Sequence, residues 1–472
     1  MWLGIDIGTS SVKALLIDSD GAIAAQAEAP LAVSRPQPLW SEQDPEDWWT
    51  ATECAALDLP GALRKSVHGI GLSGQMHGAT VLGADDAVLR PAILWNDGRS
   101  AAQCEALMRR VPDATKITAN LVMPGFTAPK LLWIAEHEPD VFAAIRTVLL
   151  PKDFVRLRMT GDKASDMSDA AGTSWLDIAG RKWSDAMLDA TGLSEGHMPR
   201  LYEGCDSTGA LLSSVAARWG MDAVPVAAGA GDNAASAIGL GAVDPGDAFI
   251  SLGTSGVFFV ADESPRPNPD AAVHCYCHAL PVRWHRMGVI LSAAATLDWA
   301  VRFGGFDSVA DALAAAGGAK AGPYFLPYLS GERTPHNDAE ATGAFVGITA
   351  DTEPGDLVRA ALEGVAFAIA DCQNALGEAG DTVVHLVGGG SRSDLWVQMI
   401  ADALRRPVAQ VAGGDVGAAL GAARLGALAA GAPRDAILSW PDPGKVIEPA
   451  TDLSDRYAAW SRLYPALKGV RA

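Results

Sequence analysis

Two stretches of the chain, one in each half, share the same order of apolar and polar positions. In residues 3–17, two largely apolar runs are separated by Gly8-Thr9-Ser10, and in residues 250–260 two such runs are separated by Gly253-Thr254-Ser255. An apolar run, a tight glycine turn and a second apolar run predict a β-hairpin in each half. The repetition predicts a duplicated domain, with nucleotide phosphates held between the halves by turn N–H groups and hydroxyls.

A further apolar run, residues 226–230, carries Asp232 to the point where a strand gives way to a loop or helix. The glycines beside it allow a sharp turn and the close approach of a ligand. In α/β proteins, catalytic groups commonly follow strand ends in this way. The alternative is that Asp232 caps the helix that begins at Asn233. The repeated hairpin that follows favours the catalytic interpretation.

Residues 69–74, Gly-Ile-Gly-Leu-Ser-Gly, match the dinucleotide-binding fingerprint letter for letter. That fingerprint requires a helix after it, but residues 75–82 have the pattern of a loop followed by a strand. We therefore predict that residues 69–74 form a strand whose glycines permit close packing, and that they bind no nucleotide.

The polar residues beyond this strand suit a ligand with many hydroxyl groups. Met76 and His77 lie between glycines at a predicted corner, and Trp95-Asn96-Asp97-Gly98-Arg99 follows the next apolar run. These side chains can pair hydroxyls and cover the apolar face of a sugar ring. The alternatives are a surface ion pair for Asp97 and Arg99, and a buried, satisfied histidine for His77.

Helical patterns occupy much of the remaining chain. Asp44 and Pro45 mark the start of one helix, residues 100–217 have a mostly helical pattern with loops, and residues 356–376 predict a long helix with one apolar side. Asp244-Pro245-Gly246 has the composition of a linker between halves.

A third glycine-rich site follows a buried strand at residues 383–387. Gly388, Gly389 and Gly390 precede Ser391 and a helix that begins at about residue 394. Glycines at this point leave a flat surface of bare backbone, against which a planar base or a ribose could lie.

His274-Cys275-Tyr276-Cys277-His278 contains zinc-ligand types but has the wrong periodicity for one metal ion. On a strand, alternation puts the two cysteines on one face and the two histidines on the other. Four ligands divided across a sheet cannot close on one zinc ion. We expect no zinc site here.

Composition narrows the class of protein. The 472 residues carry a formal charge of −20, which disfavours a nucleic-acid surface, and six scattered cysteines do not form a disulfide framework. No apolar run reaches membrane-spanning length, and the N-terminal segment lacks the pattern of a signal peptide. We expect a cytoplasmic protein of two to three domains. The sequence leaves the oligomeric state open, a homodimer included.

Four motifs of the chain are Gly74-Gln75-Met76-His77-Gly78, Trp95-Asn96-Asp97-Gly98-Arg99, Gly231-Asp232-Asn233 and Leu329-Ser330-Gly331-Glu332-Arg333-Thr334-Pro335-His336. The chain has neither a P-loop nor the His-Arg-Asp loop of protein kinases. The four motifs resemble those of the FGGY family of carbohydrate kinases, in the branch that phosphorylates ketoses, and the resemblance runs from Gly4 to about Tyr464.

This resemblance implies an α/β fold of two ribonuclease-H-like domains, as in actin-like ATPases and sugar kinases, with sugar and ATP in the cleft between them. The domains would cover residues 1–243, for sugar binding and catalysis, and residues 244–472, for ATP binding. The implied reaction is the Mg²⁺- and ATP-dependent phosphorylation of D-xylulose at its 5-hydroxyl.

The resemblance also assigns roles to individual residues. Asp232 would be the general base, and Asp6 would bind magnesium through water near the phosphates. Together with the polar cluster, the sugar site would contain Met76, His77, Trp95, Asn96, Asp97, Arg99 and Asn233. The ATP site would contain Gly8, Thr9, Ser10, Gly253, Thr254, Gly389, Gly390 and Ser391.

Two other classes stay open at this point. One is a kinase for another ketose or polyol, such as ribulose or glycerol, because few residues choose the sugar. The other is a non-catalytic ATP switch of the actin or Hsp70 kind, which would leave the clusters around His77 and Trp95 without a purpose.

Overall fold

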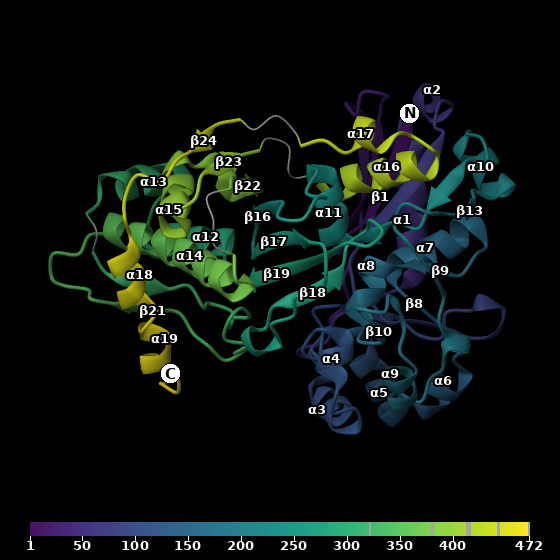
Figure 1. Cartoon of the computed structure of the whole chain (residues 1–472), viewed down its shortest axis with the longest axis horizontal. Coiled ribbons are helices and arrows are strands. Elements are labelled where there is room, and N and C mark those ends of the chain that lie inside the picture. The colour runs from purple at the N-terminus through teal and green to yellow at the C-terminus, as the bar shows by residue number, and fades with distance from the viewer. Residues whose placement is uncertain (321, 379–381, 412–416, 441–443, 471–472) are drawn as a thin grey trace.

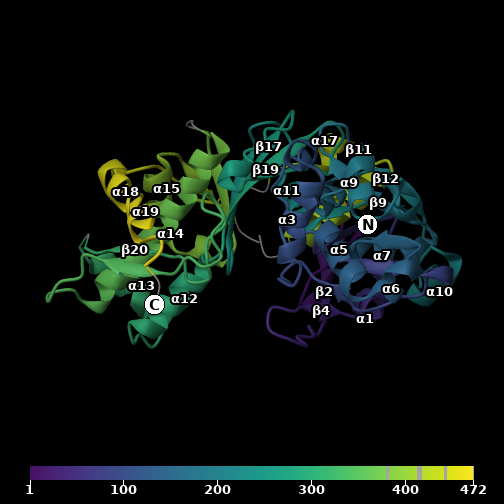
Figure 2. The ribbon, with the colours of Figure 1, turned by 90° about the horizontal axis from the view of Figure 1, so that it is seen from below.

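The computed structural model describes residues 1–320, 322–378, 382–411, 417–440 and 444–470, which fold into two lobes (Figures 1 and 2). Each lobe is built on a seven-stranded sheet. The order in the first is β13 (Ser207–Ala210), β14 (Pro225–Ala227), β5 (Gly69–Gly74), β1 (Trp2–Ile7), β2 (Ser11–Ile17) and β3 (Ile23–Pro30), with β15 (Ala230–Gly231) also paired to β5. The order in the second is β18 (His274–Cys277), β19 (Trp284–Ile290), β17 (Gly256–Asp262), β16 (Ala248–Leu252), β22 (Val384–Val387), β23 (Val408–Gln410) and β24 (Val446–Ile447).

The two sheets are connected in the same way, which confirms the predicted repeat. β1 is antiparallel to β2 and parallel to β5, and β16 is antiparallel to β17 and parallel to β22. A third antiparallel strand extends each hairpin, β3 in the first sheet and β19 in the second. Both Gly-Thr-Ser segments therefore lie at hairpin turns on equivalent edges of the two sheets.

Shorter elements surround the sheets. The described residues also form two-stranded pairs: β4 (Glu42–Gln43) with β7 (Ala92–Ile93), β6 (Thr80–Leu82) with β8 (Thr147–Leu149), β9 (Ala164–Asp166) with β12 (Arg200–Tyr202), β10 (Leu176–Asp177) with β11 (Lys182–Trp183), and β20 (Tyr324–Leu326) with β21 (Ala344–Val346). The short 3₁₀ segments are η1 (Ala84–Asp86), η2 (Ala171–Thr173), η3 (Glu195–His197), η4 (Pro269–Ala271) and η5 (Gly389–Arg392).

The helices divide between the two halves of the chain. The first half contains α1 (Pro45–Asp58), α2 (Gly61–Arg64), α3 (Ala101–Arg110), α4 (Ala114–Thr118), α5 (Thr127–His137), α6 (Pro139–Ala144), α7 (Pro151–Thr160), α8 (Met167–Ala170), α9 (Asp185–Ala190), α10 (Ser213–Trp219) and α11 (Asp232–Leu240). The second contains α12 (Ala294–Phe303), α13 (Val309–Gly318), α14 (Pro354–Leu376), α15 (Asp394–Leu404), α16 (Gly417–Ala429), α17 (Arg434–Ile437), α18 (Ser454–Trp460) and α19 (Leu463–Leu467).

The predicted helix starts are confirmed where capping residues mark them. Asp44 is the N-cap of α1, and its side chain accepts a hydrogen bond from the backbone N–H of Glu46. The long helix α14 begins at Pro354, close to the predicted start. The expectation of mostly helix for residues 100–217 is wrong in part, because the segment also contains β8 to β13. These strands have two to four residues each, too few for a visible alternation. β8 and β9 pair with segments distant in the sequence, whereas β10 and β11 pair with each other.

Helix α16 crosses back from the second half to cover the first sheet (Figure 1). It packs on the glycines of β5 so closely that a Cβ at Gly71 would lie 1.8 Å from the carbonyl oxygen of Ala422. This confirms that residues 69–74 are a strand whose glycines serve packing. Residues 413–423 are rich in glycine and alanine, a composition that predicts tight helix packing. The residues from Gly417 on lie in this contact, and residues 413–416 lie outside the described residues.

Alternation along β1 decides which groups face α16. Leu3, Ile5 and Ile7 belong to a core cluster with Trp48 of α1 and Phe154 of α7. Gly4 faces the opposite way, where a Cβ would meet the backbone of α16. Asp6 shares the face of Gly4, because successive side chains on a strand alternate. Asp6 therefore points to the side of the sheet that α16 and its neighbour α11 cover.

Residues 241–247 link α11 to β16, and a shared apolar cluster joins the lobes on either side of this link. It contains Ala237 of α11, Phe249 and Phe259 of the second sheet, and Trp175 of the first lobe. In the described part of the chain, no helix is both long enough and apolar enough to cross a membrane.

Candidate active site

Three parallel strands of the first sheet end at one edge and bring Asp6 and Asp232 to the same region. Asp6 on β1 pairs in register with Ser73 on β5, and Ser73 pairs in register with Ala230 on β15. Asp232 follows β15 directly and is the first residue of α11. Carboxyl ends of adjacent parallel strands meet at one edge, which is the usual ligand-binding edge of α/β sheets.

The carboxyl group of Asp232 is tuned to titrate near neutral pH. Its Oδ1 accepts hydrogen bonds from the backbone N–H of Asn233, at 2.7 Å, and from Asn233 Nδ2, at 2.8 Å. Burial, followed by the negative charge of Asp6, raises the pKa of Asp232 to about 7, against the opposing effect of the Asn233 bonds. Gly231 occupies the N-cap position of α11, so Asp232 does not cap this helix. A half-buried carboxylate with such a pKa suits a general base.

Asp6 is held by Ser73, whose hydroxyl donates to Asp6 Oδ1 at 3.0 Å. Burial raises the pKa of Asp6, and the Ser73 bond and the charge of Lys13 oppose the shift. The charge of Asp6 disfavours ionisation of Asp232, so a cation beside the two carboxylates would be stabilised.

His77 is fixed in one orientation and one tautomer. Its Nδ1 lies 2.6 Å from the carbonyl oxygen of Gly172, and its ring stacks on Phe126 with centroids 4.8 Å apart. A carbonyl only accepts, so Nδ1 carries the proton and Nε2 keeps its lone pair. Burial, with the charge of Lys130, lowers the pKa of His77 to about 3, so the ring is neutral at physiological pH. His77 Nε2 is therefore a hydrogen-bond acceptor.

Met76 lies beside the strand that carries Asp232. A Cβ at Gly231 would be 2.8 Å from Met76 Cγ, and a Cβ at Gly172 would be 2.9 Å from Met76 Cε. The structure thus brings the predicted sugar-site residues Met76, His77 and Asn233 together around Asp232.

Trp95 is half exposed, and its indole N–H donates to Thr9 Oγ1 at 3.0 Å. Thr9 Oγ1 donates in turn to Gln75 Oε1 at 3.0 Å, and Gln43 Nε2 donates to the Thr9 carbonyl at 2.7 Å. Gln75 also donates to Gln43. Two buried amides therefore fix the first Gly-Thr-Ser turn, a role that the sequence did not reveal.

Asp97 and Arg99 form a buried ion pair, so the surface alternative is wrong. Arg99 pairs with Asp97 and with Glu42, with both N–O separations at 2.7 Å, and the side chains of Asp97 and Arg99 are 1% exposed. Trp40 covers the guanidinium at 3.6 Å from its ring centroid. The pair is thus away from the solvent surface and holds the loop that presents Trp95, and its assignment to the sugar site stays a prediction. Asn96 is exposed.

The second Gly-Thr-Ser turn is braced by α12. The carbonyls of Gly253 and Thr254 accept from the backbone N–H groups of Ala294 and Ala293, at 2.8 and 2.9 Å. In the first turn, Gly8 N–H donates to the carbonyl of Ser11 at 3.0 Å. The Ser10 carbonyl accepts from Leu31 in the same turn.

The third glycine site lies next to the second turn because β16 and β22 are parallel neighbours. A Cβ at Gly390 would be 2.2 Å from Leu252 Cδ2, whereas Gly389 has no atom within 4 Å of that position among the described residues. Ser391 Oγ donates to the carbonyl of Gly388 at 2.8 Å. The predicted ATP-binding residues of the second half are therefore adjacent, and Gly389 presents open backbone.

Comparison with protein families identifies the architecture. The N-terminal domain of the FGGY family of carbohydrate kinases matches residues 1–239, and the C-terminal domain of the same family matches residues 248–430. The chain belongs to the FGGY family of carbohydrate kinases.

Relatives within the FGGY family cover nearly the whole chain. A xylulose kinase from Escherichia coli K12 is 56% identical over 437 residues, which is 91% of this chain and 90% of that protein. A solved structure from Brucella ovis, described as a xyloylose kinase, has a TM-score of 0.96 at 51% identity and covers 100% of both chains. A gluconate kinase structure from Lactobacillus acidophilus has a TM-score of 0.91 at 26% identity and covers 99% of this chain and 97% of that chain. This FGGY chain is a carbohydrate kinase with the two-domain fold that the sequence predicted.

The carboxylates of this FGGY kinase fit a magnesium ion that is shared with nucleotide phosphates. Mg²⁺ is usually held by one or two carboxylates together with substrate phosphates, and it keeps several waters. Asp6 supplies one such carboxylate, next to the first glycine turn. Across the described ranges, no three His, Cys, Asp or Glu residues cluster closely enough to hold an ion by themselves.

A buried ionic cluster supports the strand that ends in Asp232, and sequence analysis missed it. Lys152 contacts Asp153, Asp166 and Asp169, and all four side chains are fully buried. Asp166 is also the N-cap of α8, whereas Asp169 pairs with Lys152.

Two contacts carry this support to the strand. Ser168 donates to Asp166 and accepts from the backbone N–H of Gly231 at 3.2 Å. Arg156 donates to the carbonyl of Ala228 at 2.8 Å. The cluster thus holds the backbone on either side of the turn before Asp232.

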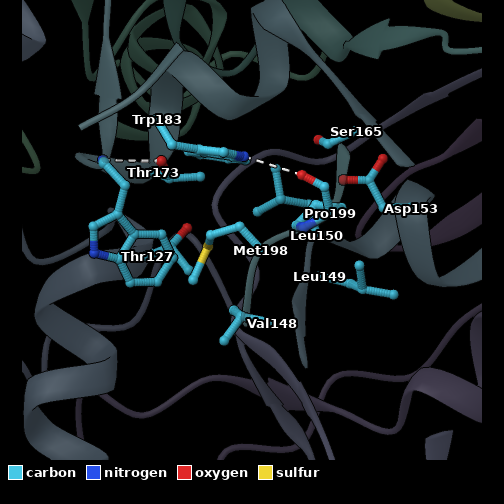
Figure 3. Close-up of a pocket in the computed structure, with 11 residues that line it drawn as sticks. Thr127, Val148, Leu149, Leu150, Asp153, Ser165, Thr173, Trp183, Met198 and Pro199 are labelled. Carbon is cyan, nitrogen blue, oxygen red and sulfur yellow. Dashed lines mark hydrogen bonds between the residues drawn. The ribbon is translucent and has the colours of Figure 1, made fainter. Parts of the chain in front are cut away.

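A small cavity beside the ionic cluster is lined by Thr127, Val148, Asp153, Ser165 and Trp183, among others (Figure 3). The Trp183 indole N–H donates across its rim to the carbonyl of Pro199 at 3.0 Å. The volume of about 10 Å³ is close to that of one water molecule and far below that of a sugar site. The cavity therefore belongs to the interior of the first lobe.

Proposed function

We propose that this FGGY kinase transfers the γ-phosphoryl group of ATP to the 5-hydroxyl of D-xylulose, which yields D-xylulose 5-phosphate and ADP. The observation that carries the proposal is the 56% identity to the xylulose kinase of E. coli over nine tenths of both chains. The carboxylate of Asp232, with a pKa of about 7 and Met76 nearby, supports a proton-transfer role beside a sugar.

In the proposed mechanism, Asp232 acts on the sugar hydroxyl. The hydroxyl oxygen attacks the γ-phosphorus, Asp232 accepts its proton, and the bond to the ADP oxygen breaks. Asn233, Met76 and His77 line the sugar, and His77 Nε2 accepts from a sugar hydroxyl because its Nδ1 proton is committed to Gly172. Trp95 covers an apolar face of the sugar next to the first glycine turn.

The nucleotide is proposed to lie between the turns. Backbone N–H groups and hydroxyls of Gly8-Thr9-Ser10 and Gly253-Thr254 would bind the phosphates, and Gly389, Gly390 and Ser391 would contact the adenosine. Asp6 would hold Mg²⁺ through water. The bound Mg²⁺ would neutralise negative charge on the phosphates. We place the enzyme in a reducing cytoplasmic compartment, because all its cysteines are free.

A sugar panel tests the proposal. ADP release is measured with D-xylulose, D-ribulose, L-ribulose, glycerol or gluconate as the single acceptor, with and without Mg²⁺. We expect D-xylulose to give the highest kcat/KM and magnesium chelation to abolish turnover. A higher kcat/KM with another acceptor would refute the substrate assignment, and ATP hydrolysis that no sugar stimulates would favour an ATP switch.

A further inference from the structure

Strand β18 of the second lobe brings Tyr276 and His274 against the proposed sugar site. The rings of Tyr276 and His77 have centroids 6.4 Å apart, and Phe126 lies 6.3 Å from Tyr276. His274 stacks on Tyr276 with centroids 5.5 Å apart. Both residues are buried. The negative charge of Asp232 contributes to a raised pKa of Tyr276, after burial as the larger cause, so the phenol also lies near the proposed base.

Arg333 determines the tautomer of His274. Arg333 Nη1 lies 3.3 Å from His274 Nε2, and a guanidinium can only donate hydrogen bonds. His274 Nε2 must therefore accept. Burial and the charge of Arg333 lower the pKa of His274, so the ring is neutral and its single proton resides on Nδ1.

The tautomer of His274 sets the direction of the next hydrogen bond. His274 Nδ1 lies 3.2 Å from the Tyr276 hydroxyl oxygen. Because Nδ1 carries the proton, the phenol oxygen accepts this bond and its own hydrogen remains available. Within the described ranges, the Tyr276 hydroxyl forms this one hydrogen bond, with His274. A buried donor without an acceptor is unfavourable, so this hydrogen requires an acceptor.

We propose that the Tyr276 hydroxyl donates a hydrogen bond to an oxygen of the bound sugar, and that Arg333 and His274 are positioning residues that fix this direction. The proposal rests on the assignment of the sugar site to the surroundings of Asp232, Met76 and His77. His77 then accepts from the sugar and Tyr276 donates to it. The first residue belongs to the first lobe and the second to β18, so the sugar is bound by both halves of the chain.

Arg333 is held firmly enough for this task. Glu332 Oε1 accepts from the backbone N–H groups of Leu291 and Arg333, at 2.9 and 2.8 Å. Thr334 and Val289 exchange two hydrogen bonds, both at 3.0 Å, which fixes the loop along β19. Arg333 Nη1 also lies 3.1 Å from Met123 Sδ of the first lobe. This loop contains the motif of residues 329–336, which resembles that of the ketose-phosphorylating branch. The proposal gives this motif a role, which is to position Arg333.

The first test is Tyr276→Phe in the full chain, with Tyr202→Phe as a matched control on β12. Removing one neutral hydrogen bond should weaken D-xylulose binding by about 3- to 10-fold, measured by calorimetry without ATP. The change should appear in KM more than in kcat, and the control should bind like the wild type. An unchanged sugar Kd in Tyr276→Phe would overturn the proposal.

A double-mutant cycle tests the positioning role of Arg333. Arg333→Met frees His274 to accept from Tyr276, so sugar binding should weaken as in Tyr276→Phe, and the double variant should match Tyr276→Phe within about twofold. Arg333→Lys keeps a donor and should retain binding within about threefold of the wild type. Additive losses in the double variant would refute the link between the two residues.

The same cycle separates this proposal from the substrate assignment. If the wild type prefers another sugar of the panel, D-xylulose is replaced by that sugar as the probe. Loss of affinity on Tyr276→Phe would then still support the donor role.

Discussion

The Nδ1 atom of His77 lies 2.6 Å from the carbonyl oxygen of Gly172, although the two residues are far apart in the sequence. His77 has a φ of +71°, an uncommon conformation for a residue other than glycine. Its carbonyl accepts from Lys130 Nζ at 2.8 Å, and its ring stacks on Phe126. The strained backbone is thus held by several independent contacts, as is typical of functional sites.

Gly172→Ala should displace His77 without a backbone penalty. A Cβ at Gly172 would lie 2.4 Å from His77 Cε1, so the ring must move. We expect kcat/KM for the sugar to fall by about 10- to 100-fold, because small displacements of positioning groups are costly. ATP affinity should be unchanged. Gly318→Ala is the control, since no atom of the described residues lies within 4 Å of its Cβ position. Wild-type sugar kinetics in Gly172→Ala would contradict the role of this contact.

The pH dependence of kcat/KM should report Asp232. Its carboxyl must be ionised to accept a proton, and its pKa is about 7 in the free enzyme. Below that pH, kcat/KM for the sugar should fall about tenfold for each pH unit. Asp371 offers the control, because burial raises its pKa to about 6 away from the first sheet. Asp371→Asn should keep the acidic limb. Activity that is level between pH 5 and 8 would exclude Asp232 as the base.

Asp232 should also lower the free energy of unfolding, to an extent that depends on pH. Its pKa is about 7 in the folded protein, against the ordinary aspartate value of 3.8 that applies in the unfolded chain. The folded state therefore binds this proton more tightly. The contribution to stability is therefore favourable at low pH and is lost as pH rises through about 7. Asp232→Asn should raise the melting temperature at pH 8, with a difference that shrinks towards pH 4.

Thermal unfolding across this pH range measures the effect. Asp394→Asn is the matched control, because hydrogen bonding from Lys445 lowers the pKa of Asp394. That variant should show no gain at pH 8. A melting temperature of Asp232→Asn that stays at or below the wild-type value at pH 8 would contradict the raised pKa.

Ser168 should position Asp232 through the backbone. Ser168→Ala leaves the N–H of Gly231 without its acceptor, and an unsatisfied buried donor costs roughly 1–3 kcal/mol. We expect a lower melting temperature and a lower kcat, with ATP affinity retained. Ser165→Ala is the control, since the Ser165 hydroxyl is buried and forms no hydrogen bond with the described residues. Equal kinetics in the two variants would refute the positioning role.

The hairpins and the strand before Asp232 could be predicted because their signals are local. Gly8 and Gly253 each follow a run of apolar residues, and the turn and strand register follow from that pattern. The repeat also shows where the halves differ. Asp6 and Ser251 occupy equivalent positions, two residues before these glycines, so a carboxylate is present in the first hairpin and a hydroxyl in the second.

The contacts that shape the site could not be predicted, because they join segments distant in the sequence. The sequence around Gly172 does not indicate that its carbonyl accepts a hydrogen bond from His77. The charges of Asp97 and Arg99 left a surface ion pair open, but the pair is buried and Trp40 covers the guanidinium. The alternation of His274 and Tyr276 was visible, whereas the approach of Arg333 depends on how the loop after β20 packs along β19 in the same lobe.

The central claim, that Asp232 is the base for sugar phosphorylation, is tested most directly by the turnover of Asp232→Asn with D-xylulose. The amide keeps the shape and can still hydrogen-bond, so calorimetry should find sugar and ATP affinities near those of the wild type. Loss of the proton acceptor should reduce kcat by roughly 10²- to 10⁴-fold. Near-normal turnover of Asp232→Asn would contradict the claim and place the base elsewhere.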